Sequence, residues 1–111
     1  MTLDKHLSGR KVVYLLRRKL GGYKIGCAND IRLRYNSKSA ISDVMLVIVV
    51  PDEMNTFSAE AMVHKFFSHK NVDGYETFDL DESDIRVFGS ILFVGGDLEV
   101  GFADQPLLAV R

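Results

Sequence analysis

The hydrophobic pattern opens with two short strands. Residues 11–16 form a β-branched and aromatic apolar run, Lys11-Val12-Val13-Tyr14-Leu15-Leu16, which is typical of a strand. A basic stretch and the pair Gly21-Gly22 follow, and Tyr23-Lys24-Ile25-Gly26 then returns as a second strand. Because paired glycines adopt the backbone conformations of tight turns, this segment predicts a β-hairpin with a basic tip.

A helix and a long apolar strand are expected next. Asn29 or Asp30 can cap the helix, since a short side-chain oxygen accepts hydrogen bonds from the first free backbone amides. The helix is predicted to end near Asn36. Residues 44–50 are continuously apolar and stop at Pro51, which is consistent with a central strand buried on both faces.

The second half of the chain predicts one more long helix and several short elements. Thr56 or Ser58 is expected to open the helix. Its apolar residues recur at helical spacing and are expected in the core: Ala59, Met62, Val63, Phe66 and Phe67. We expect a short strand at 74–78, a final helical segment at 81–87 and a hairpin at 91–102.

These elements predict an α+β fold. A small mixed or antiparallel β-sheet would be built by the β-hairpin and then α-β-α-β, flanked by helices, with an extra C-terminal β-hairpin. We divide the 111 residues into a lead-in at 1–10, one domain at 11–87 and a hairpin extension at 88–111 packed on that domain. The apolar C-terminal hairpin either completes the core or pairs with a second copy, which would give a homodimer.

Composition narrows the classes of protein. The single cysteine, Cys27, excludes an internal disulfide and a cysteine-based zinc cluster, and it is typical of a reduced compartment. The longest apolar run, residues 44–50, is far shorter than the roughly 18 residues of a membrane span. We expect no membrane association and a cytoplasmic location, in the host cytoplasm for a phage-encoded protein.

Charge is distributed unevenly along the chain. Residues 1–38 carry ten Lys or Arg against two acids, whereas residues 39–111 carry four against thirteen. The net charge of −1 therefore hides a basic half that can meet phosphates. Solvated faces that pair across the fold would explain the same charges.

Chemistry-bearing residues form an incomplete catalytic set. The chain lacks a Ser-His-Asp arrangement, a phosphate loop ending in Lys-Ser/Thr and a His-x-x-x-His pair. Polar residues nevertheless stand out on otherwise apolar elements: Tyr14, Tyr23, Lys24, Arg34, Glu60 and His64.

These residues follow the order of a known family. Val12-Val13-Tyr14 and Lys24-Ile25-Gly26 resemble the paired tripeptides of the GIY-YIG endonuclease superfamily, and Arg34 follows Gly26 by eight residues on the next helix. The segments Ala59-Glu60-Ala61-Met62-Val63-His64 and Gly74-Tyr75-Glu76-Thr77-Phe78 are similar to the phage-encoded and fungal meiotic branch. The resemblance covers roughly residues 11–86.

The resemblance implies a division of roles. Glu60 would bind a divalent metal, Mg²⁺ or Mn²⁺, and Arg34 would hold a nonbridging phosphate oxygen. Tyr14, with Lys24 nearby, would position or deprotonate the attacking water, and His64 would orient water or assist proton transfer. Contacts with nucleic acid, chiefly DNA, would come from basic residues along the hairpin and the first helix: Arg17, Arg18, Lys19, Lys24, Arg32 and Lys38.

The sequence therefore predicts a metal-dependent endonuclease that hydrolyses phosphodiester bonds in DNA. The alternative is a catalytically weak or inactive module that binds nucleic acid or protein, since Lys24 replaces the usual tyrosine and a late asparagine has no counterpart. Single residues also have structural explanations: Tyr14 as a core aromatic, Arg34 in a salt bridge with Asp30, and Glu60 favouring the helix dipole. Duplex, branched and single-stranded DNA, and RNA, are all open as substrates.

Overall fold

The structure is a computed structural model and describes residues 9–31 and 43–101. Four strands form the main sheet: β1 (Val12–Arg17), β2 (Tyr23–Ala28), β3 (Val44–Val49) and β4 (Thr77–Phe78). Three helical segments lie between and after them: α3 (Thr56–Phe66), the short 3₁₀ helix η2 (Ser68–Lys70) and α4 (Glu82–Gly89). A separate hairpin follows: β5 (Ile91–Val94) and β6 (Asp97–Val100). The predicted α+β class is confirmed.

The main sheet is antiparallel and has the strand order β3-β1-β2-β4. β1 and β2 form the expected hairpin, in which Tyr14 pairs with Gly26 and Arg17 with Tyr23. Gly21 and Gly22 take positive φ angles at the turn, a conformation that costs glycine nothing. The sequence expectation of a hairpin turning at these glycines is met.

β3 lies at the edge of the sheet among the described strands, so the expected central position was wrong. It pairs with β1, and the register shifts between Leu15 and Leu16, where β3 carries one extra residue, Met45. Val49 is 38% exposed. The apolar run of β3 has another explanation. On one face its side chains pack in the larger core with the helices, and on the other they pack in a second apolar cluster, so both faces favour apolar residues. The strand also contains the bulge at Met45.

The longest helix, α3, begins at Thr56, one of the two residues expected to open it. Asn55 is the N-cap, and its side chain accepts hydrogen bonds from the backbone amides of Phe57 and Ser58. The buried residues Ala59 and Val63 lie four positions apart, and Phe67, four further on, is buried just beyond the helix end. Phe66 lies about 100° round from Phe67 on the helix and is 41% exposed, so its expected place in the core was wrong.

α4 is fixed by reciprocal caps and by an ion pair. Asp81 accepts a hydrogen bond from the Asp84 amide, and Asp84 accepts one from the Asp81 amide. Lys70 donates to the Asp84 carboxylate at 2.7 Å. That hydrogen bond raises the pKa of Lys70. Burial alone would raise the pKa of Asp84, but the hydrogen bonds from Lys70 and from the Asp81 amide outweigh it and leave the pKa below its ordinary value.

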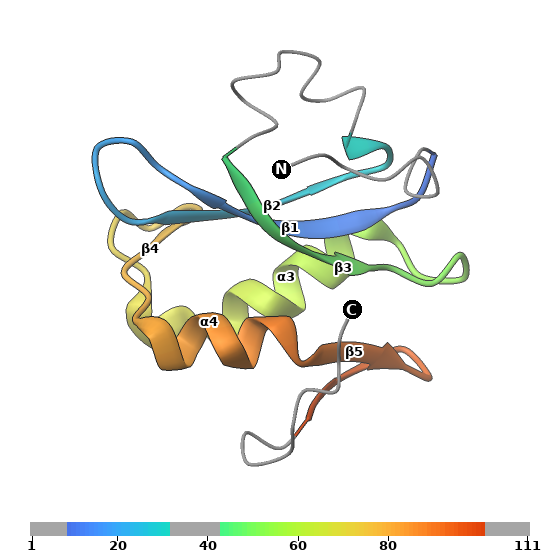
Figure 1. Ribbon diagram of the computed structural model, residues 1–111. Helices are drawn as coiled ribbons and strands as arrows, with labels where there is room; N and C mark the ends of the chain where they lie inside the picture. The colour runs from blue at the N-terminus through green and yellow to red at the C-terminus, as the bar shows by residue number, and fades with distance from the viewer. Residues whose placement is uncertain (1–8, 32–42, 102–111) are drawn as a thin grey trace.

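Figure 1 shows α3 and α4 on one face of the main sheet, with the β5–β6 hairpin farther out on that side. The larger apolar core fills this space and includes Val13 and Leu15 of β1 together with Ile91 and Phe93 of β5. A second apolar cluster lies on the opposite face and contains Val12, Tyr14, Ala28, Ile31 and Val44. Because side chains alternate along a strand, β1 supplies residues to both clusters.

The helix expected from Asn29 or Asp30 begins at Ile31, where the described segment ends. Arg32, Arg34 and Lys38 therefore lie outside the described residues, as do the lead-in up to residue 8 and the tail from residue 102.

Candidate active site

The two tripeptides of the hairpin meet through one close contact. Tyr14 lies opposite Gly26, and its ring crosses β2 at that position. A Cβ atom on Gly26 would lie 2.5 Å from the Tyr14 hydroxyl oxygen and 2.6 Å from Cζ. Since a contact this short is sterically forbidden, the glycine is what allows the tyrosine ring to lie across the strand.

Lys24 lies on the same side of the hairpin as Tyr14. Its Nζ is 5.9 Å from the centroid of the Tyr14 ring, within the range of a cation–π contact. The same ammonium group lies 3.5 Å from Oε1 of Glu76, and the Lys24 side chain is only 16% exposed. One lysine thus connects the buried tyrosine with a carboxylate that comes from the loop before β4.

Glu60 and His64 project together from α3. They are four residues apart and therefore share one side of the helix, with His64 Nε2 3.8 Å from Glu60 Oε2. Both side chains are partly exposed, Glu60 to 20% and His64 to 26%. His64 also packs edge-on against Phe78, with ring centroids 5.1 Å apart.

A hydrogen bond fixes the tautomer of His64. Its Nε2 lies 2.8 Å from the carbonyl oxygen of Ile25. Because a carbonyl oxygen only accepts, Nε2 must carry the hydrogen and donate it. In the neutral ring, Nδ1 then keeps the lone pair and is the acceptor.

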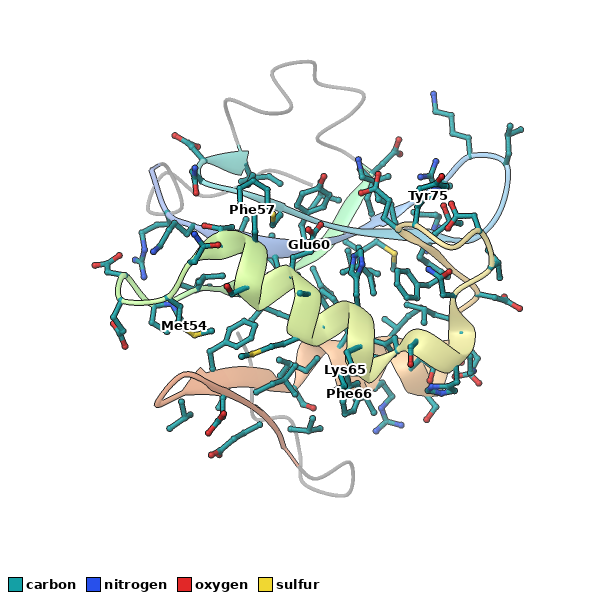
Figure 2. All side chains as sticks on the ribbon, turned by 180° about the vertical axis from the view of Figure 1, so that it is seen from behind. Met54, Phe57, Glu60, Lys65, Phe66 and Tyr75 are labelled. Atoms are coloured by element: carbon teal, nitrogen blue, oxygen red, sulfur yellow. The ribbon has the colours of Figure 1, made fainter. Side chains whose placement is uncertain are left out.

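The backbone of Ile25 bonds both to α3 and to the loop before β4. Its carbonyl oxygen accepts from His64, and its amide donates to the backbone oxygen of Glu76 at 3.1 Å. Lys24 precedes it in β2, and Figure 2 shows Glu60 between α3 and the sheet. Lys24, Glu60, His64 and Glu76 therefore gather along the outer edge of β2, which we call the β2-edge site.

The start of α3 is tied to the far end of the same strand. The Thr56 hydroxyl donates to Oδ1 of Asn29 at 2.8 Å, immediately after β2 ends at Ala28. This bond sets the position of the helix along the strand, and Glu60 follows Thr56 by one helical turn. The β2-edge site is consequently held at both ends, by Thr56 and by His64.

Glu60 is the carboxylate that α3 could offer to a metal ion. No group of three or more His, Cys, Asp or Glu side chains that could hold a metal occurs within 9–31 and 43–101. His64 Nε2 is occupied by the Ile25 carbonyl, so Glu60 is the ligand that the α3 face offers. Mg²⁺ is commonly bound by one or two carboxylates and otherwise by water and phosphate oxygens, whereas structural zinc takes four protein ligands.

The Tyr14 ring is enclosed by apolar side chains. It is completely buried and belongs to the cluster on the face opposite α3. Its hydroxyl lies over Gly26, the residue that follows Ile25 in β2. The structure therefore places Tyr14 close to Lys24 on one face of β2 and Glu60 close to His64 on the α3 side.

The basic tip lies at the end of the hairpin beside β4. Arg17 pairs with Tyr23, which in turn pairs with Phe78 of β4. Arg17 and Lys19 are exposed, and Arg18 is half-buried with no hydrogen-bond partner on its Nε. The tip therefore offers cationic groups at the Lys24 end of the β2-edge site.

Glu76 is the member of the site that sequence reasoning did not select. A signal was present, because Glu76 lies within the Gly74–Phe78 segment that resembles the family and directly precedes β4. Its contact with Lys24 requires β4 to align against β2, and that pairing is two residues long and joins distant parts of the chain.

No protein-family model, curated protein or solved structure matches this chain. Within the described ranges, none of the helices has the length and apolar content needed to cross a bilayer. A functional assignment therefore depends on the residues of the β2-edge site.

Proposed function

We propose that the protein is a metal-dependent endonuclease of the GIY-YIG type that hydrolyses phosphodiester bonds in DNA. The observation that supports this most is the pairing of Glu60 and His64 on α3, 3.8 Å apart, where His64 bonds to the Ile25 carbonyl at the outer edge of β2. A carboxylate that can hold a metal ion and an imidazole that can take a proton are groups that phosphodiester hydrolysis needs.

Glu60 would hold the divalent metal through its carboxylate. When bound, the cation neutralises charge on the scissile phosphate and stabilises the leaving oxygen. His64 accepts a proton at Nδ1 from the attacking water, because its Nε2–H is held by Ile25. Arg34, which lies outside the described residues, binds a nonbridging oxygen in this proposal.

Tyr14 and Lys24 act from the other face of β2. Lys24 lies near the Tyr14 ring and adds positive charge close to the phosphate path. Tyr14 is fully buried, and its hydroxyl lies over Gly26. That burial favours the second candidate function, a nucleic-acid-binding or protein-interaction module without catalysis, in which Tyr14 is purely structural.

The test compares nicking of supercoiled plasmid by the wild type, Glu60→Gln and His64→Ala in Mg²⁺ and in Mn²⁺. Glu60→Gln keeps the shape of the side chain but removes its charge, so nicking and metal-induced stabilisation should both be lost. His64→Ala should slow nicking by about 10²- to 10⁴-fold, the usual size of a general acid–base contribution.

Glu99→Gln serves as the matched control, because Glu99 is an exposed glutamate on β6. It should nick like the wild type. If the wild type neither nicks nor gains thermal stability with either metal, catalysis is excluded and the binding module becomes the function. Circular dichroism of each variant verifies that the fold is intact.

A further inference from the structure

Two exposed aromatic side chains flank the β2-edge site. Phe57 on α3 is 72% exposed and Tyr75, in the loop before β4, is 79% exposed. Figure 2 shows Phe57 on one side of Glu60 and Tyr75 on the other. Aromatic rings normally bury most of their surface, so two rings presented to solvent beside one site call for a ligand with flat apolar faces.

Both rings are carried by backbone that hydrogen bonds hold in place. The Phe57 amide donates to the Asn55 cap at 2.9 Å. The Tyr75 amide donates to Asp73 at 2.9 Å, and the Tyr75 carbonyl accepts from Asn71 at 3.1 Å. The bond from the Tyr75 amide is also the main reason that the pKa of Asp73 lies below its ordinary value. The backbone that carries each ring is thus fixed, which lowers the entropy cost of ordering these segments when a ligand binds.

Charged groups lie between and beyond the two rings. Phe57 precedes Glu60 by three residues, about 4.5 Å along the helix axis. Tyr75 directly precedes Glu76, which contacts Lys24, and the tip with Arg17 lies beyond that end of the strand. This edge therefore carries aromatic, acidic and basic side chains. A protein interface would favour a continuous apolar patch instead.

We propose that the substrate is single-stranded or branched DNA whose unpaired bases stack on Phe57 and Tyr75, on either side of the scissile phosphate. This rests on the proposed function of the same site. In a duplex the faces of the bases are already stacked on one another, whereas unpaired bases expose them to aromatic side chains. Lys24 and the basic tip hold the phosphates, and the two rings select for strands that are not paired.

Single-tryptophan reporters test the stacking directly. The chain contains no tryptophan, so Phe57→Trp and Tyr75→Trp each introduce one fluorophore. They are titrated in EDTA, which prevents hydrolysis, with oligothymidylate and with a hairpin duplex of equal phosphate content. We expect quenching by the single strand and little change with the duplex. Phe66→Trp is the matched control, because Phe66 lies on the opposite side of the same helix and should not respond.

Binding affinity gives the second measurement. Phe57→Ala and Tyr75→Ala should each weaken oligothymidylate binding by about five-fold or more, as expected for one lost base–aromatic contact. Phe66→Ala should bind like the wild type. Glu60→Gln should also bind in EDTA while failing to nick. Wild-type protein that stacks on oligothymidylate but nicks no DNA in either metal would count against the nuclease proposal alone.

Three results would overturn the inference: reporters that stay silent while the wild type binds or nicks DNA, equal binding of single strand and duplex, or no binding of either. A change of oligomeric state on Phe57→Ala or Tyr75→Ala, seen by size-exclusion chromatography, would assign the two rings to a protein interface instead.

Discussion

Adding a single methyl group at Gly26 should destabilise the whole fold. Gly26 does not have a positive φ, so alanine suits its backbone and any cost arises from the side chain. The new Cβ would lie 2.5 Å from the Tyr14 hydroxyl oxygen and 2.6 Å from Cζ. Tyr14 is completely buried, so its ring has no solvent-filled space into which it can move.

The size of the effect follows from overpacking. Forcing an extra methyl group into a filled core costs about 1 to 3 kcal/mol. For a domain near this size each kcal/mol corresponds to about 4 to 8 °C in Tm. Gly26→Ala should therefore lower the Tm by roughly 4 to 24 °C. Gly89→Ala is the matched control, since its Cβ would meet Leu46 at an ordinary 3.6 Å, and it should be neutral or slightly stabilising.

Urea unfolding followed by circular dichroism measures the free energy of each variant, and a double-mutant cycle isolates the contact. Tyr14→Leu alone should destabilise the fold by removing buried aromatic surface. Combined with Gly26→Ala, it should cost less than the sum of the two single changes by about 1 kcal/mol or more, because the smaller side chain leaves room for the methyl group. Strict additivity, or a Gly26→Ala protein as stable as Gly89→Ala, would refute the reasoning.

Two further predictions concern protons. Asp84→Asn should lower the free energy of unfolding by about 1 to 2 kcal/mol at neutral pH, because Lys70 loses its charged acceptor. The pKa of Asp84 is lowered in the folded state, so the stability difference between the wild type and Asp84→Asn should persist down to about pH 4 and vanish below it. Urea titrations at several pH values measure both free energies of unfolding. Two curves that do not converge at low pH would contradict the prediction. The ¹⁵N shifts of His64 should place the hydrogen of the neutral ring on Nε2, and a hydrogen on Nδ1 would be incompatible with the bond to Ile25.

The sequence predicted local structure well and long-range placement less well. The glycine pair at the first turn and the apolar runs of β1 and β2 each have a local physical cause, so the hairpin could be predicted. The edge position of β3 could not be predicted. Apolar side chains are favoured wherever a strand has apolar clusters on its faces, whether it lies at the centre or at the edge of the sheet. The prediction that Phe66 is buried was wrong for a related reason. Helical spacing shows which side of the helix faces the core, but it does not fix how wide the buried stripe is.

In the candidate site, too, the local geometry could be predicted from the sequence and the long-range contacts could not. The i to i+4 spacing places Glu60 and His64 on one side of a helix, and the structure has them 3.8 Å apart. Their relation to Tyr14 depends on which face of the sheet α3 covers, and no local pattern in the chain encodes that choice. Glu76 escaped notice because its role arises only where β4 meets β2, a contact between segments about fifty residues apart.

The bonding of Ile25 also bears on how the folded chain avoids self-association. A strand edge with free amide and carbonyl groups is a template on which another chain can add a strand. At Ile25 both groups are taken, one by the His64 ring and one by the Glu76 backbone. His64 therefore acts as a gatekeeper against intermolecular β-pairing. Replacing His64 with a residue that has no ring would leave the Ile25 carbonyl oxygen free to accept a hydrogen bond from a strand of another molecule. The first defect of such a variant should be aggregation at high protein concentration, whether or not the protein cuts DNA.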